Sequence, residues 1–106
     1  MGNVYIVEGA RTAFTSFGGS LSNVDAVELG TATAIEALKR SNVSPEHVEH
    51  VIYGGVITTG ENSAYLARHI GLKAGVPQEV PALTLNRLCG SGMQSIVTAA
   101  QHILLG

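Results

Sequence analysis

Apolar residues gather in short runs along the chain, and stretches with helical spacing follow them. The runs cover Val4–Val7, Val48–Tyr53 and Ala82–Asn86, and glycine follows each of them within a few residues. Short apolar runs bounded by turn residues predict β-strands, and the run at Val4–Val7 predicts a strand buried on both faces. The pattern therefore predicts three strands.

Apolar side chains recur every three or four residues after each run, which is typical of helices with one buried face. The predicted helices run from Asp25 to about Arg40, from Asn62 or Ser63 to about Leu72, and from about Gly92 to Leu104. Asp25 and Glu28 have the spacing of a capping box, in which each side chain binds a free amide of the first turn. Lys39 and Arg40 lie near the carbonyl end of the first helix, where cations are favoured.

The predicted order is β-α-β-α-β-α, and alternating strands and helices indicate an α/β fold with a mainly parallel sheet. A strand order of 3-2-1 makes Val4–Val7 an edge strand, although it has no Lys, Pro or bulge to protect such an edge. The last predicted helix reaches Leu104–Gly106 with no strand after it. We therefore expect the natural fold to continue past residue 106.

Composition narrows the classes of function. The 106 residues suffice for one domain with one core, and they carry a net charge of -2 with 5% aromatic residues, which argues against a nucleic-acid partner. No apolar run approaches the roughly 18 residues of a membrane span. The first residues, Met1–Tyr5, show no basic or Arg/Ser-rich leader, so we expect a cytoplasmic protein.

Two further features of the composition point to partners and chemistry. Charged residues make up 13% of the chain, against about 25% in typical domains, so we expect other protein to cover much of the surface. The single cysteine, Cys89, has no partner for an internal disulfide and cannot anchor a cysteine-rich zinc site alone. The acidic residues are scattered, and no metal site is expected.

Cys89 is the candidate catalytic residue. A lone cysteine can be a small buried apolar residue, but this one lies between a predicted strand and a predicted helix and is followed by Gly90-Ser91-Gly92. Amides of the first helical turn have no partner within the helix, and the helix N-terminus stabilises an anion such as a thiolate by about 1 to 2 kcal/mol. The same amides can receive the oxyanion of a thioester under attack. Arg87 adds to this effect if its side chain turns toward the sulfur.

The segment Asn86-Arg87-Leu88-Cys89-Gly90-Ser91-Gly92-Met93-Gln94-Ser95-Ile96 resembles the nucleophile motif of thiolases, the family of acetyl-CoA acetyltransferases and 3-ketoacyl-CoA thiolases. Other segments are also similar to the family: Val4–Val7 with Ala10–Thr12, Phe17–Leu21, Glu28–Gly30, Ala67–Leu72 and Gly75–Pro77. Ala13 and Thr15 depart from the family, which commonly has Pro and Gly there. These two departures affect a loop and leave the nucleophile motif intact.

The resemblance implies an incomplete N-terminal half of the five-layer thiolase architecture, with residues 1–106 as a partial N-terminal domain. It implies an acyl-CoA:acetyl-CoA C-acyltransferase of fatty acid metabolism, in which Cys89 takes an acyl group from acyl-CoA and a second CoA species accepts it. Either thiolytic cleavage of 3-ketoacyl-CoA or condensation of two acetyl-CoA results. Coenzyme A thioesters are substrates and no cofactor is implied. A homo-oligomer, dimer or tetramer, is implied, with Ala82–Asn86 pairing with its symmetry mate.

The resemblance also implies residues that this chain lacks. In the family, a His in a Gly-His-Pro segment and a second Cys, both far downstream, act as acid and base, and the CoA-binding loop lies downstream too. None of the four histidines has that setting, and His47 and His50 are expected to face solvent. We expect only the longer chain to be active.

Three alternatives remain open. The chain can be a catalytically inert thiolase fragment that at most associates with other chains. It can belong to the decarboxylating condensing enzymes, which tend to carry Cys-Ser-Ser where this chain has Cys89-Gly90-Ser91. It can hold a redox-sensing thiol. The paired glycines Gly18-Gly19 and Gly54-Gly55 fit no nucleotide-binding motif and are read as turn residues, and Arg68 is either a surface charge or an interface residue.

Overall fold

The structure is a computed structural model that describes residues 2–106. Along the chain its elements are α1 (Ala26–Ser41), the 3₁₀ turn η1 (Pro45–His47), β1 (Val51–Gly54), the 3₁₀ turn η2 (Ser63–Tyr65), α2 (Leu66–Lys73), β2 (Ala82–Leu85) and α3 (Ser91–Leu105). The α/β class and the three predicted helices are confirmed, as are the second and third predicted strands.

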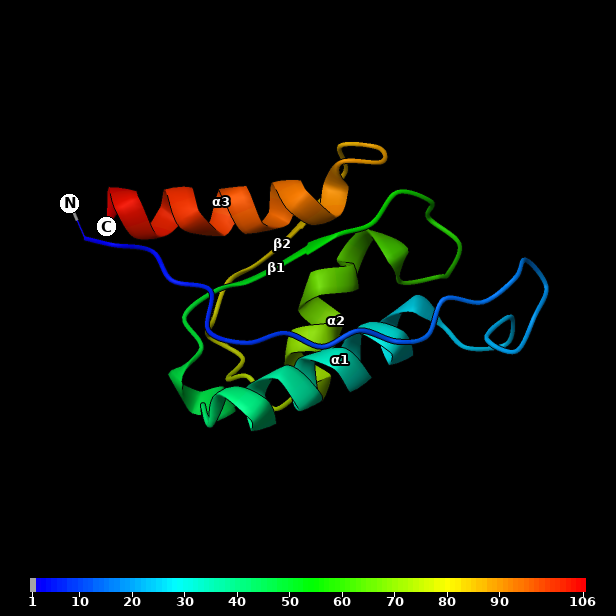
Figure 1. The fold of residues 1–106 in the computed structure, drawn as a ribbon, viewed down its shortest axis with the longest axis horizontal. Helices are drawn as coiled ribbons and strands as arrows, with labels where there is room; N and C mark the ends of the chain where they lie inside the picture. Colours follow the sequence, from blue (N-terminus) through cyan, green and yellow to red (C-terminus); the bar gives the residue numbers. More distant parts are fainter. Residues whose placement is uncertain (1) are drawn as a thin grey trace.

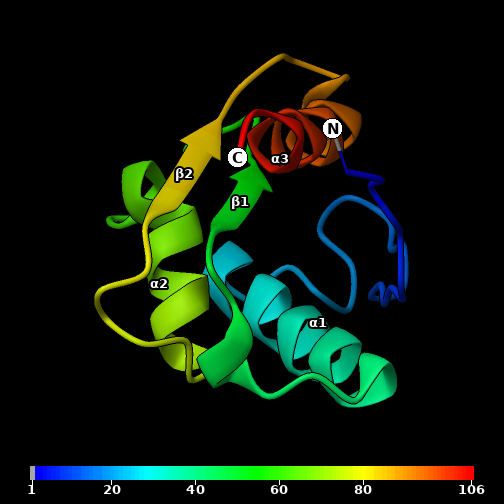
Figure 2. The same ribbon diagram turned by 90° about the vertical axis from the view of Figure 1, so that its left-hand side faces the viewer.

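The two strands form a parallel pair that is covered on both faces. Val51 lies opposite Ala82, and the register continues to Gly54 opposite Leu85. Helix α2 packs against one face of the pair and α1 packs against α2, whereas α3 crosses the other face over β1 (Figures 1 and 2). The predicted parallel sheet is therefore present as two strands within three layers.

Helix α1 begins where the capping box predicts. The Asp25 carboxylate accepts a hydrogen bond from the Val27 amide at 3.2 Å, and the Asp25 amide donates to the Glu28 carboxylate at 3.3 Å. The helix ends at Asn42, whose φ of 56° lies in the left-handed region that closes many helices. Local sequence alone thus accounts for both ends of α1.

Most of the core lies around α2. One buried cluster joins Val27 of α1 to Leu66 and Ile70, and a second joins Val51 of β1 to Ala67 and Val76. Arg68 of α2 donates hydrogen bonds to the carbonyl oxygens of Val80 and Gln78 at 3.0 and 2.7 Å. This arginine therefore fixes the loop that leads into β2.

The prediction of a buried strand at Val4–Val7 is wrong. Tyr5 and Ile6 are 74% and 81% exposed, and the segment forms no strand. Figure 2 shows the N-terminal segment apart from β1, and a cavity lined by Val7 and Val51 lies between them. A strand needs a hydrogen-bonded neighbour, and no strand among residues 2–106 lies beside this segment.

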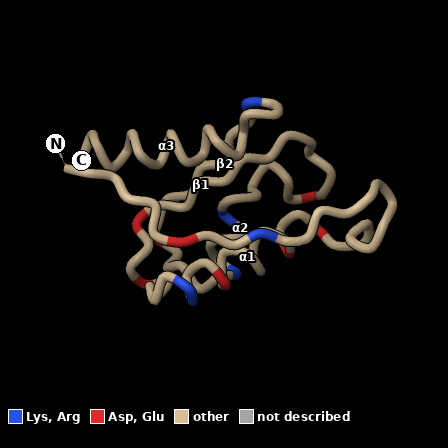
Figure 3. The backbone as a smooth tube through the Cα atoms, in the orientation of Figure 1, with Lys and Arg blue, Asp and Glu red and all other residues tan. Residues whose placement is uncertain are grey.

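Helix α3 presents an uncharged surface. It contains no Lys, Arg, Asp or Glu, and Figure 3 shows the charged residues on α1, on α2 and in the loops instead. Apolar side chains of α3 remain exposed, among them Met93 at 67% and Ile103 at 57%. The expectation that other protein covers part of this surface stays a prediction.

None of the helices in residues 2–106 is both long and apolar enough to cross a membrane.

Tyr53 of β1 gives a prediction on pH dependence. Burial raises the pKa of the Tyr53 phenol above its ordinary value of 10.0, and a hydrogen bond with the Thr33 side chain partly opposes this rise in pKa. The folded state therefore keeps the proton at pH values where the unfolded chain loses it. The stabilisation is complete below pH 10.0 and is lost as pH rises from there through the folded-state pKa.

We expect Tyr53→Phe to reduce this alkaline loss of stability. The measurement is the thermal unfolding midpoint of both proteins over a pH series that crosses the ordinary phenol pKa. Tyr5→Phe, at an exposed site, controls for the loss of a hydroxyl group. Parallel curves for wild type and Tyr53→Phe would contradict the prediction.

Candidate active site

Cys89 lies at the surface, in the turn that joins the end of β2 to the start of α3 (Figure 1). The alternative of a small buried apolar cysteine is therefore wrong. The side chain lines neither of the two cavities described below. An exposed thiol in this position is open to a substrate that approaches the N-terminal end of α3.

The turn before Cys89 has an unusual backbone. Leu88 has a φ of 50°, in the left-handed region that side chains other than glycine rarely adopt. The Asn86 side-chain oxygen accepts a hydrogen bond from the Leu88 amide at 2.9 Å. The Ser91 hydroxyl accepts one from the Arg87 amide at 2.8 Å and donates one to the Leu88 carbonyl at 2.7 Å.

The backbone after Cys89 leads directly into α3. The Gly90 amide donates to the Arg87 carbonyl at 3.0 Å, and the first helical hydrogen bond runs from the Gln94 amide to the Gly90 carbonyl at 2.9 Å. No side chain caps this helix end. The amides of Gly92 and Met93 therefore have no backbone acceptor within residues 2–106 and are available to an anion.

The sheet holds this helix end in place through Gly54. A β-carbon added at Gly54 would lie 2.6 Å from the Ser91 carbonyl oxygen and 2.8 Å from the Ser91 β-carbon. Ser91 itself is only 3% exposed. The end of β1 thus supports the start of α3 at a distance that only glycine allows. The sequence suggested only a turn residue at this position.

The Arg87 side chain binds Gln94 of α3. Its guanidinium donates a hydrogen bond to the Gln94 side-chain oxygen at 2.9 Å, and no hydrogen bond joins it to Cys89 in the described part of the chain. The suggestion that Arg87 adds to activation of the sulfur is therefore not supported. Arg87 instead ties the turn to the first turn of α3.

The contacts of the described histidines do not involve Cys89. The Nδ1 atoms of His50 and His102 are 2.9 Å apart, with ring centroids 4.7 Å apart, and join the segment before β1 to the last turns of α3. His47 is exposed as predicted, and His50 is partly exposed, with its ring beside that of His102. His69 packs edge-on against Tyr65. Within residues 2–106 no histidine hydrogen-bonds to the thiol.

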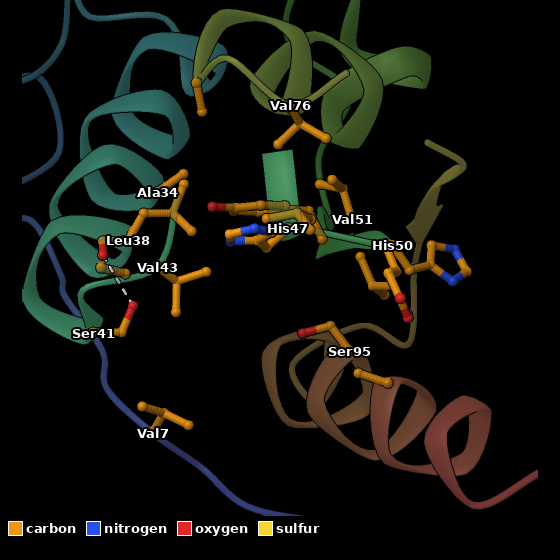
Figure 4. A pocket seen from close by; sticks show the side chains of 18 of the residues that line it. Val7, Ala34, Leu38, Ser41, Val43, His47, His50, Val51, Val76 and Ser95 are labelled. Carbon is orange, nitrogen blue, oxygen red and sulfur yellow. Dashed lines mark hydrogen bonds between the residues drawn. The ribbon is translucent and has the colours of Figure 1, made fainter. Parts of the chain in front are cut away.

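Two cavities lie beside the strands. The larger, of about 910 Å³, lies between Val7, α1, β1 and α3, and Figure 4 shows Val7 and Ser95 on opposite sides of it. The smaller, of about 450 Å³, includes Gly54 and Asn86 in its lining and so borders the turn that carries Cys89. Across the described residues, no three or more His, Cys, Asp or Glu side chains are grouped to hold a metal ion.

Comparison with known protein families decides the relationship. Residues 4–106 match the family model described as the N-terminal domain of thiolase. The chain belongs to the thiolase family. The resemblance inferred from the cysteine motif is thereby confirmed, and it extends over nearly the whole chain.

Individual thiolases are similar along the same range. The β-ketothiolase BktB of Cupriavidus necator is 52% identical over 103 residues, which are 97% of this chain and 26% of that protein. An acetyl-CoA acetyltransferase of Clostridioides difficile is 48% identical over 95 residues, 90% of this chain and 88% of the matched sequence. The solved human mitochondrial 3-ketoacyl-CoA thiolase in complex with CoA matches with a TM-score of 0.91 at 48% identity, over 93% of this chain and 25% of that one.

The chain thus spans about a quarter of the length of BktB and of the human thiolase. The structural match supports the expectation of a partial thiolase fold. The cytoplasmic location stays a prediction, because the human relative's name places that protein in mitochondria. The catalytic role of Cys89 likewise stays a prediction.

Proposed function

We propose that the protein carrying this chain transfers acyl groups between coenzyme A thioesters, with Cys89 as the nucleophile. The observation that carries the proposal is the exposed position of Cys89 at the N-terminal end of α3, within a segment that belongs to the thiolase family. Names of relatives agree on this chemistry: 3-ketoacyl-CoA thiolase and acetyl-CoA acetyltransferase. A human relative is solved in complex with CoA.

The first step forms an acyl-cysteine. The Cys89 thiolate attacks the thioester carbonyl carbon, a new carbon–sulfur bond forms, and CoA leaves as its thiolate, which takes up a proton. Negative charge on the carbonyl oxygen grows during the attack, and free amides at the start of α3 are suited to stabilise it. The exposed thiol and the uncapped helix end support this step.

The second step transfers the acyl group. In condensation, the α-carbon of a second acetyl-CoA loses a proton to a base and attacks the acyl-cysteine carbonyl, which releases the Cys89 thiolate. In thiolysis, the Cys89 thiolate instead attacks the 3-keto carbon of a 3-ketoacyl-CoA, the bond between C2 and C3 breaks, and acetyl-CoA leaves as an enolate that takes up a proton. The CoA thiolate then attacks the acyl-cysteine carbonyl and releases the Cys89 thiolate. We propose that the acid and base lie in parts of the protein outside this chain, since His50, His69 and His102 contact other residues and none of the described histidines hydrogen-bonds to Cys89. The atoms and charges of both steps balance without a cofactor.

A homo-oligomer is part of the proposal. Strand β2 pairs on one side with β1, and its other edge has no strand beside it within residues 2–106. We propose that a symmetry mate pairs at this edge, as the family resemblance implies. Its pairing would also cover apolar surface such as Leu83, which is 37% exposed.

The decisive experiment looks for the acyl-enzyme. The protein is mixed with acetyl-CoA, quenched in acid and digested, and the peptides are analysed by mass spectrometry. We expect one acetyl group on the peptide that contains Cys89, and its loss after CoA is added. Absence of this adduct from the intact protein, or acetyl groups on lysines alone, would contradict the proposal. Peroxide-dependent oxidation of Cys89 without acetylation would favour the redox-sensing alternative.

A further inference from the structure

We infer that Asn86 and Ser91 are positioning residues that hold Cys89 in its reactive geometry by locking the left-handed backbone of Leu88. The inference rests on the proposed function, because it assigns a task to these residues in the reaction of Cys89. Both residues belong to the same short segment as the cysteine, and the steps proposed above leave both of them without a role.

The backbone at Leu88 needs outside support. A leucine with a φ of 50° is sterically disfavoured, and such a residue persists only where its surroundings fix it. The Leu88 carbonyl and the Cys89 amide form one planar peptide unit. The orientation of that unit sets the direction in which the Cys89 side chain leaves the turn.

Side chains on both flanks supply the support. The Asn86 side-chain oxygen binds the Leu88 amide at 2.9 Å, and the Ser91 hydroxyl binds the Leu88 carbonyl at 2.7 Å. Both polar groups of Leu88 are therefore held by side chains on opposite sides of Cys89, and the Ser91 amide donates a second hydrogen bond to the Leu88 carbonyl at 3.0 Å. The Ser91 hydroxyl also accepts from the Arg87 amide at 2.8 Å, so it closes the turn from the helix side.

Each of the two residues is itself anchored to the sheet region. The Asn86 amide nitrogen donates to the Val56 carbonyl oxygen at 3.0 Å, which ties the turn to the loop after β1. Ser91 is 3% exposed and lies against Gly54 of β1. The hydrogen bonds of Asn86 and Ser91 to Leu88 thus fix Cys89 relative to β1 and the loop that follows β1.

The two hydrogen bonds of Asn86 can be separated by substitution. Asn86→Asp keeps an oxygen acceptor for the Leu88 amide but loses the donor to Val56, whereas Asn86→Ala removes both bonds. Ser91→Ala removes both bonds of the hydroxyl. Leu88→Gly removes the steric penalty of the left-handed backbone, since glycine adopts positive φ freely. Gln101→Ala is the matched control, because Gln101 is an exposed residue of the same helix and lies far along α3 from this turn.

We expect kcat for acyl transfer to fall about 10²-fold in Asn86→Ala and in Ser91→Ala, with KM changed much less. Asn86→Asp should lose less than Asn86→Ala. Adding Leu88→Gly to Ser91→Ala should restore part of kcat, which a general loss of stability would not allow. Gln101→Ala should stay within about twofold of wild type by the same reasoning. Thermal unfolding checks that every variant is folded, and Asn86→Asp serves if Asn86→Ala fails to fold.

A second readout separates this inference from the proposed function. The rate of Cys89 alkylation by iodoacetamide needs no CoA chemistry, and in Asn86→Ala and Ser91→Ala it should move toward the rate of the urea-unfolded protein. If wild type forms no acetyl-cysteine but the alkylation rates shift as stated, the proposed function is contradicted while the positioning role of Asn86 and Ser91 is supported. Folded Asn86→Ala and Ser91→Ala proteins with wild-type kcat and wild-type alkylation rates would overturn the inference.

Discussion

Cys89→Ser is expected to reduce acyl transfer by at least about 10³-fold, because a serine hydroxyl at neutral pH is a far weaker nucleophile than a thiolate and no base within residues 2–106 hydrogen-bonds to this side chain. The exposed position of Cys89 makes the exchange of sulfur for oxygen mild for the fold. The measurement is kcat/KM for thiolysis of a 3-ketoacyl-CoA, followed by the loss of substrate absorbance.

The control for Cys89→Ser is a measurement of its stability. Its thermal unfolding midpoint should equal that of wild type, so that the lost activity belongs to the sulfur alone. Activity above one tenth of wild type in a folded Cys89→Ser protein would show that the acyl group does not pass through Cys89. That result would leave the protein in the thiolase family by sequence while removing the covalent mechanism proposed for it.

The predictions that succeeded rest on local sequence. The capping box at Asp25 and Glu28 involves residues three apart, so the sequence is sufficient to locate the start of α1. The turn that carries Cys89 is predicted for a similar reason, since Gly90 and Gly92 lie within a few residues of the cysteine, between a predicted strand and a predicted helix. Features determined within one turn of the chain can be derived from the chain alone.

The prediction that failed depends on contacts far apart in sequence. Val4–Val7 has the composition of a buried strand, yet composition cannot supply the neighbour with which a strand exchanges hydrogen bonds. The contact of His50 likewise depends on a distant residue, since its partner His102 lies fifty-two positions along the chain. Both positions look local in the sequence, and both are decided by what the folded chain places beside them.

The candidate site shows both kinds of determinant together. The sequence indicated Cys89 and the glycines after it, but the roles of Asn86 and Ser91 follow from hydrogen bonds that only the folded turn reveals. The sequence does contain a signal for these roles, because Asn86 lies three positions before the cysteine and Ser91 lies two positions after it. Short polar side chains flanking a turn commonly bind its backbone.

Gly54→Ala is expected to have the second large effect, on both stability and activity. The added β-carbon would lie 2.6 and 2.7 Å from the carbonyl oxygen and carbon of Ser91, well inside contact distance. Overpacking of this kind typically destabilises a protein by about 1 to 3 kcal/mol. Because the atoms in contact belong to the first residue of α3, the helix end beside Cys89 must shift.

The clash cannot be relieved by trimming a side chain, since the two nearest atoms belong to the Ser91 backbone. We therefore expect a lower thermal unfolding midpoint together with a loss in kcat of about 10²-fold, the size associated with a 1 Å displacement of a reacting group. Gly9→Ala is the matched control, because an added β-carbon there meets nothing within 4 Å. If Gly54→Ala kept wild-type kcat, the sheet would not be what positions the nucleophile, and the turn would have to hold Cys89 through Asn86 and Ser91 alone.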